Sequence, residues 1–215
     1  MFSVWITAAK DVLLDVLFPP SARSRRVAVE KDAPLSCTPN TRNTGSHAIT
    51  ILASYDEPRV RDAICALKFE RDQHACGLLA DMLDDFLLEH IADEALFGRR
   101  VVAVPIPLGK KRLAERGLNQ IESVLRATHA VRSGRLPLVP ALVRTRETKM
   151  QSTLRRAERL TNMRDAFSIA PGIPSLHNTT VLLIDDVTTT GATLSEAAHT
   201  LKSAGATVQL IALAG

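Results

Sequence analysis

Aromatic residues are scarce in this sequence, since Phe, Trp and Tyr together make up only 4% of its 215 residues. So few rings do not offer an obvious stacking platform for the bases of single-stranded nucleic acid. Gly and Pro occur in ordinary numbers, and the chain has no internal repeat and no low-complexity segment. With 46% apolar residues, a chain of this length can bury one good core and carry a small appendage. The composition therefore predicts a globular protein.

The sequence has only three cysteines, Cys37, Cys65 and Cys76, and none of them belongs to a Cys-x-x-Cys pair. An odd and sparse set is typical of reduced thiols rather than of a disulfide framework. The cysteine count therefore predicts a cytoplasmic protein.

The apolar N-terminus, MFSVWITAAKDVLLDVLF, lacks a basic n-region, and Lys10, Asp11 and Asp15 interrupt its apolar run. Neither a signal peptide nor a membrane-spanning helix fits this pattern. The apolar residues recur instead at helical spacing, at Phe2, Trp5, Ile6, Ala9, Leu13, Val16 and Leu17. This spacing favours a short helix, packed on its own domain or on a protein partner, over membrane contact.

Positive charge is concentrated in one segment, residues 142–164, which holds seven basic and two acidic residues. Its local charge of +5 leaves about −1 for the rest of a chain whose total is +4. Such a segment suits a polyphosphate or nucleic acid partner, and it equally suits a solvated helix face.

Strand and helix patterns alternate along the chain. Apolar runs predict strands at residues 49–53, 101–104, 139–143, 180–184 and 208–213. Helical patterns fall at residues 56–68, with Asp56 as the N-cap and Pro58 in the first turn, at 72–90, from 118 onward, and at 192–203. Residues 21–45 are polar and aperiodic, which predicts an extended linker. Strands that are apolar on both faces predict an α/β fold, with a parallel sheet flanked by helices.

Two adjacent carboxylates, Asp185 and Asp186, end the apolar run of VLLIDDVTTTGAT, residues 181–193. Ligands of α/β sheets bind at this carboxyl end of the strands. Backbone N–H groups at the start of the following helix bind phosphate, and Thr hydroxyls add donors. The loop that supplies these groups is Thr188, Thr189, Thr190, Gly191, Ala192 and Thr193. Carboxylates accept hydrogen bonds from ribose hydroxyls, so the pattern predicts a ribose 5-phosphate site.

This motif resembles the phosphoribosyl pyrophosphate (PRPP) motif of type I phosphoribosyltransferases, and most of the chain resembles one branch of them, the competence-associated ComF family. Four further blocks carry the resemblance: LLDVLFPP, ALKFERD, VPIPLGKKRLAERGLNQ and TKMQSTLRRAERLTNMRDAF. The resemblance implies a type I phosphoribosyltransferase-like fold with a short N-terminal helical or irregular extension. It also implies ribose binding by Asp185 and Asp186, and 5-phosphate binding by the loop.

Further residues match the family blocks. By this resemblance Lys110 and Arg112 are the candidates for binding pyrophosphate, and Mg²⁺ would bridge the ligand near the two Asp residues. Gln151, Arg159 and Asn162 match polar positions of a block that could close over the ligand. Lys68 and Arg116 match basic positions without an assigned role.

The sequence departs from the family at its N-terminus. The family carries zinc-binding cysteines after Phe-Pro-Pro, but Ser21 to Arg25 contain no thiol, and Cys37 alone does not supply the roughly four ligands that a structural zinc needs. We therefore expect no zinc, a helix and degenerate zinc-finger-like linker over residues 1–46, and a phosphoribosyltransferase-like domain over 47–215.

Two functions remain open at this point. The first is a PRPP-binding, phosphoribosyltransferase-like protein associated with DNA uptake, which could catalyse transfer to an acceptor that the sequence does not identify. The second is a non-catalytic or regulatory protein that contacts single-stranded DNA through residues 142–164.

Overall fold

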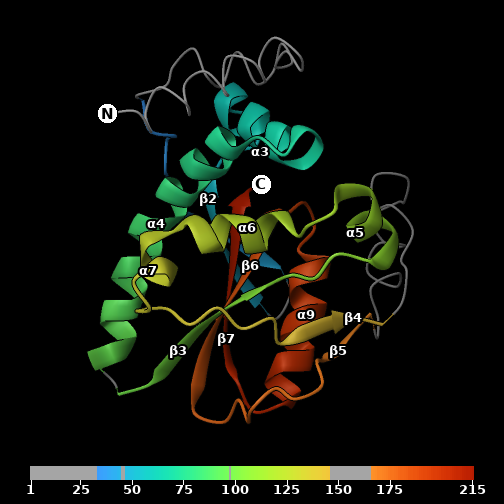
Figure 1. The fold of residues 1–215 in the computed structure, drawn as a ribbon. Coiled ribbons are helices and arrows are strands. Elements are labelled where there is room, and N and C mark those ends of the chain that lie inside the picture. The colour runs from blue at the N-terminus through green and yellow to red at the C-terminus, as the bar shows by residue number, and fades with distance from the viewer. Residues whose placement is uncertain (1–32, 45–46, 97, 146–165) are drawn as a thin grey trace, which may run out of the picture.

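The computed structural model describes residues 33–44, 47–96, 98–145 and 166–215. A five-stranded sheet forms the centre of the molecule (Figure 1), in the order β1-β2-β7-β6-β3. Its strands are β1 (Asn40–Thr44), β2 (His47–Ala53), β3 (Arg100–Pro105), β6 (Thr179–Val187) and β7 (Thr207–Ala214). The last four run parallel, and β1 joins the edge antiparallel to β2.

The strand β6 lies in the middle of the parallel part and shows why this sequence folds as it does. Its first six residues are buried, and the last three, Asp185, Asp186 and Val187, are partly exposed. Leu182 and Ile184 face one core cluster, and Val181 and Leu183 face the other. Fully burying such a side chain contributes about 1.5–3 kcal/mol, so a strand with helices on both faces must be apolar throughout.

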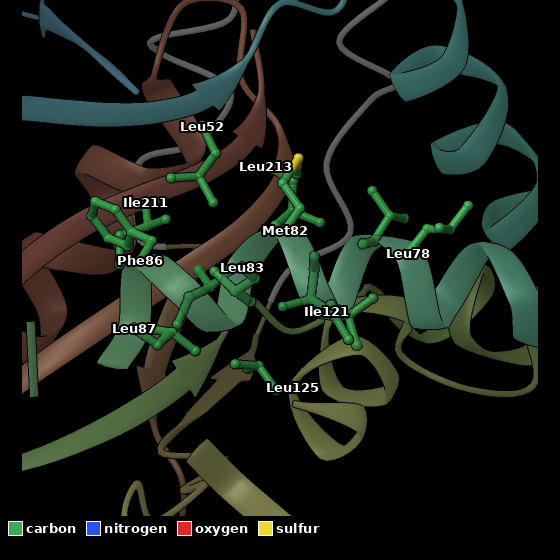
Figure 2. Packing of buried hydrophobic residues seen from close by; sticks show 14 of the residues in the cluster. Leu52, Leu78, Met82, Leu83, Phe86, Leu87, Ile121, Leu125, Ile211 and Leu213 are labelled. Carbon is green, nitrogen blue, oxygen red and sulfur yellow. The ribbon is translucent and has the colours of Figure 1, made fainter. Parts of the chain in front are cut away.

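Helices cover both faces of the sheet. One face carries α3 (Pro58–Glu70), α4 (Gln73–Leu96), α6 (Gln120–Ala127) and α7 (His129–Arg132), while α9 (Ala192–Ser203) covers the other. In the first cluster, side chains of α4 and α6 meet those of β2 and β7 (Figure 2), including Met82, Leu83, Phe86, Leu87, Ile121, Leu125, Leu52, Ile211 and Leu213. A short helix, α5 (Lys110–Arg116), follows β3 and buries none of its residues.

The predicted α/β fold, a parallel sheet flanked by helices, is confirmed. The predicted helix at residues 192–203 has those bounds in the structure. The helix predicted from Asp56 instead has Glu57 as its N-cap, because Pro58 occupies the first helical position. Asp72 does cap α4, since its Oδ1 accepts a hydrogen bond from the N–H of Ala75 at 3.0 Å.

Two predictions need correction. The linker predicted over residues 21–45 is wrong at its end, because residues 40–44 form β1, whose polar side chains suit an exposed sheet edge. The strand predicted at 139–143 is instead β4 (Leu142–Arg144), which pairs with β5 (Phe167–Ile169) in a separate antiparallel sheet. Residues 1–32 lie outside the described part of the chain, so the predicted N-terminal helix and the division at residue 46 stay predictions. None of the helices described is long and apolar enough to cross a membrane.

Candidate functional site

A cavity of about 120 Å³ opens at the carboxyl ends of β3 and β6. This is the edge at which parallel α/β sheets bind ligands. Its walls come from α3, the turn after β3, α5, β4, β6 and the start of α9. The lining residues are Lys68, Ile106, Pro107, Leu108, Arg112, Arg116, Arg144, Asp185, Asp186, Val187 and Thr193.

The two carboxylates of β6 have different surroundings. The Oδ2 of Asp186 lies 2.9 Å from the ammonium of Lys68, in an ion pair whose side chains are only 15% and 19% exposed. The Oδ1 of Asp185 accepts a hydrogen bond from the backbone N–H of Asp186 at 2.8 Å. Burial, and then the neighbouring charge of Asp186, raise the pKa of Asp185 to about 7, against the opposing effects of that hydrogen bond, Lys68 and Arg144.

Four cations line the same cavity as these carboxylates. Lys68 comes from α3, and Arg144 from β4, while Arg112 and Arg116 both lie on α5. Arg112 and Arg116 are one helical turn apart, which places them on the same side of α5. Lining groups of this kind would hold a strongly anionic group such as pyrophosphate beside two hydroxyl-binding carboxylates.

The Thr-rich loop connects β6 to α9 by a sharp turn at Gly191. Gly191 has φ of 74°, and a Cβ there would lie 2.6 Å from Cδ1 of Ile49 and 3.0 Å from Cγ2 of Thr44. Only glycine fits both this conformation and this contact. The turn brings the loop to the N-terminus of the twelve-residue α9, whose backbone dipole favours anions.

The loop residues divide between scaffold and cavity. Thr188 is buried, and its N–H donates to the carbonyl of Ala214 at 2.9 Å. The carbonyl of Thr189 accepts a hydrogen bond from Arg42 of β1 at 3.2 Å, and Oγ1 of Thr190 accepts one from the N–H of Ala192 at 3.4 Å. Of the six predicted loop residues, Thr193 lines the cavity.

The structure brings together Asp185, Asp186, Thr193 and Arg112 from the set that the sequence predicts. Lys110, the other pyrophosphate candidate, is exposed at the first position of α5 and is not part of the cavity wall. Gln151, Arg159 and Asn162, like Ser21 to Arg25, lie outside the described residues.

Three contributors to the site were not assigned a role from the sequence. In the sequence, Lys68 and Arg116 are matching basic positions of the family blocks, and Arg144 is one cation of a basic segment. The sequence signal for Lys68 is the block ALKFERD, which places a cation in the last turn of α3. Its partner could not be seen, because Asp186 is distant in the sequence.

The side chains of the cavity indicate what kind of metal site is possible here. Within the described residues, no group of three or more His, Cys, Asp or Glu side chains is placed to hold a metal ion. Mg²⁺ commonly uses one or two carboxylates together with substrate phosphates and water. Asp185 and Asp186 therefore fit a Mg²⁺ that arrives with a phosphorylated ligand, and they do not make a site of their own.

Known proteins with similar sequences include a phosphoribosyltransferase domain family and proteins named for competence or DNA utilization. The family model described as "Phosphoribosyl transferase domain" matches residues 118–215. The chain is 29% identical to "DNA utilization protein YhgH" of Escherichia coli O6:H1 strain CFT073, over 75% of this chain and 69% of that protein. It is 33% identical to "Competence protein ComFC" of Streptococcus pneumoniae strain R6, over 68% of this chain and 59% of that protein. It is also 34% identical to "Competence protein F" of Haemophilus influenzae, over 47% and 44%. The chain thus spans less than two thirds of the two competence proteins.

Solved structures are similar at a lower level. A hypoxanthine phosphoribosyltransferase from Staphylococcus aureus has 20% identity and a TM-score of 0.35, over 63% of this chain and 60% of that one. A phosphoribosyltransferase from Corynebacterium diphtheriae has 18% identity and a TM-score of 0.32, over 88% and 78%.

Proposed function

Because this chain belongs to the ComF family of competence-associated, phosphoribosyltransferase-like proteins, we propose that it binds PRPP with Mg²⁺ in the cavity at the end of β6. The observation that carries the proposal is the pairing of Asp185 and Asp186 with four cations around one small cavity. PRPP has the complementary groups, since it joins a ribose with two hydroxyls to a 5-phosphate and a pyrophosphate.

In the proposed complex, each part of the ligand meets a different element. The carboxylates of β6 accept hydrogen bonds from the ribose hydroxyls. The 5-phosphate lies against the loop and the N-terminus of α9, where Thr193 lines the cavity and the helix dipole favours an anion. The pyrophosphate faces Arg112, Arg116 and Arg144. Lys68 contacts Asp186 and also lines the cavity, so its ammonium lies close to the ribose hydroxyls.

The same arrangement would support transfer chemistry. In such a transfer, the bond between the anomeric carbon and pyrophosphate would break and pyrophosphate would leave with the electron pair, while the lone pair of an acceptor nitrogen forms the new bond and that nitrogen releases its proton to solvent. Cations held in a small cavity would stabilise the charge that develops on the leaving group. Bound Mg²⁺ would supply further stabilisation of that charge. The residues described here contribute positioning and charge, and no covalent nucleophile is required.

Isothermal titration with PRPP and MgCl₂ tests the proposal. We expect heat from the wild type, and at least tenfold weaker binding from Asp185→Asn/Asp186→Asn, because amides replace the two carboxylates that accept hydrogen bonds from the ribose. The matched control is Asp81→Asn, an exposed carboxylate on α4, which should bind like the wild type. Equal heats from the wild type and the double variant would exclude this site.

A second candidate function is contact with single-stranded DNA, which is favoured by relatives named for competence and DNA utilization. The basic segment 142–164 was the sequence-based candidate surface, but residues 146–164 lie outside the described structure. Arg144, which is described, lines the PRPP cavity. The test is oligonucleotide affinity over a salt series, where phosphate contacts give a steep decrease with salt. A flat response would argue against phosphate contacts.

A further inference from the structure

An exposed aromatic ring lies beside the cavity. Phe69, near the end of α3, is 69% exposed, more than any other large apolar side chain in the described residues. The guanidinium carbon of Arg116 lies 5.9 Å from the centre of the ring. Arg116 also lines the cavity, and it donates a hydrogen bond to Oε1 of Gln120 at 3.0 Å. The ring is therefore held by a cation that is itself fixed, while most of its surface stays in water.

A second contact fixes the junction between α3 and α5. Arg71 ends α3 in the left-handed conformation, with φ of 55°, which is uncommon for a residue with a side chain. Its guanidinium packs against Gly117, the residue that ends α5. Gly117 has φ of 75°, which favours glycine, and a Cβ there would lie 2.9 Å from Nη2 of Arg71. Two arginine contacts, from Arg71 to Gly117 and from Arg116 to Phe69, thus bring the C-terminal ends of α3 and α5 together.

Helix α5 has basic residues outside the cavity wall as well as within it. Its sequence KKRLAER has four basic residues and one acidic residue, and none of the seven is buried. Arg112 and Arg116 line the cavity, while Lys110 and Lys111 are exposed outside it. Figure 1 shows α5 at the periphery of the molecule, away from the packed helices on the face of the sheet.

We propose that Phe69 and the outer side of α5 form a binding surface for single-stranded nucleic acid. One unpaired base stacks on the exposed ring, and the phosphates beside it contact the cations of α5. An aromatic ring for bases and cations for the backbone are the combination by which proteins bind single strands. A free base entering the cavity would use the ring but not Lys110 and Lys111, so the charge distribution favours a polymer. This inference rests on the second candidate function and gives it a location.

Fluorescence anisotropy of a labelled oligothymidylate, titrated with the full-length chain, tests the inference. Phe69→Ala should weaken binding about 5- to 100-fold, which corresponds to loss of one base–aromatic stack, and should leave the salt dependence unchanged. Phe69→Trp should restore affinity, and the fluorescence of the new indole should be quenched by the oligonucleotide. Lys110→Glu should instead reduce the salt dependence, because it removes a phosphate contact.

The controls separate this surface from the PRPP site and from general charge effects. Arg135→Glu changes an exposed cation that follows α7 and should bind more tightly than Lys110→Glu. Affinity for a blunt duplex should be unaffected by Phe69→Ala, because paired bases cannot stack on the ring. Calorimetry with PRPP on Phe69→Ala should match the wild type. If Phe69→Ala binds the oligonucleotide like the wild type, or if the wild type does not bind it, the inference fails, while the PRPP titration still decides the proposed function independently.

Discussion

At the scale of single residues, Asp185 and Asp186 are chemically alike and structurally different. Asp186 has a cationic partner, Lys68, at 2.9 Å, whereas Asp185 has the backbone N–H of its neighbour. Burial is the largest influence on Asp185, because a low-dielectric environment disfavours the charged form. A carboxyl whose pKa lies near neutral pH changes its charge readily when a ligand brings hydroxyl donors or a cation.

The raised pKa of Asp185 predicts a pH dependence of stability. The pKa is about 7 in the folded protein, against an ordinary value of 3.8, so the folded state holds this proton more tightly than the unfolded chain. The free energy of unfolding contributed by Asp185 is therefore present at low pH and is lost as pH rises through about 7. Asp185→Asn removes this loss. In urea unfolding across this range, the stability of the variant relative to the wild type should increase with pH and level off above the folded pKa.

The same measurement on Asp81→Asn provides the comparison, because that carboxylate is exposed. Its stability relative to the wild type should change little over the same range. A difference between Asp185→Asn and the wild type that does not vary with pH would contradict the assignment.

At the scale of elements, the turn after β3 is held in place by the start of α6. Oδ1 of Asn119 accepts hydrogen bonds from the N–H groups of Ile121, at 3.1 Å, and Glu122, at 3.4 Å. Its Nδ2 donates to the carbonyl of Ile106 at 2.9 Å. One side chain therefore caps a helix and fixes a wall of the cavity, since Ile106, Pro107 and Leu108 line it.

Asn119→Ala should consequently affect both stability and ligand binding. Losing the cap should lower the free energy of unfolding by about 1–2 kcal/mol, measured by urea unfolding. Losing the bond to Ile106 should also weaken PRPP binding in calorimetry, because the wall of the cavity becomes less ordered.

Asp84→Ala is a matched control for that change. Asp84 of α4 accepts hydrogen bonds from the N–H groups of His129 and Ala130, both at 2.9 Å, at the start of α7. It should cost a similar amount of stability without changing PRPP affinity, since α7 does not contribute to the cavity. Equal losses of PRPP affinity in the two variants would show that the effect comes from general destabilisation.

At the scale of the whole molecule, the order of strands positions the Thr-rich loop between β6 and α9. β1 and β2 are early in the sequence, yet β2 lies beside β7, which itself pairs with β6. Thr44 and Ile49 therefore contact Gly191, and Arg42 bonds to the carbonyl of Thr189. The loop is shaped by the edge of the sheet as much as by its own residues.

This packing predicts different costs for two glycine substitutions. Gly134→Ala places a side chain at φ of 75° with nothing within 4 Å, so it should cost only the conformational strain, about 1–2 kcal/mol. Gly191→Ala has the same strain at φ of 74° and also meets Ile49, which should add about 1–3 kcal/mol of overpacking. Urea unfolding of both variants measures the difference, and Gly191→Ala should also weaken PRPP binding. Equal destabilisation by the two substitutions would contradict the contact.

The sequence by itself determined the elements and the chemical character of the site. Residues 181–184 had to be part of a buried strand because they are apolar on both faces, and the carboxylates then fall at its carboxyl end. The helix at 192–203 followed from local pattern, and the parallel sheet followed from the alternation of strands and helices. The strand and the helix depend on interactions between residues close in the chain, which a sequence displays directly, and the parallel pairing follows from the helices that connect the strands.

Only the tertiary structure decided which distant groups meet the carboxylates. Lys68, Arg116 and Arg144 come from three separate elements, and each could equally have been a solvated surface cation. The pairing of β1 was missed because its residues, NTRNT, are polar and gain their place from the neighbouring strand rather than from burial. The position of the exposed Phe69 beside the cavity is likewise known only from its contact with Arg116. Such contacts depend on the relative placement of elements, which the packing of the whole chain fixes and which no local pattern records.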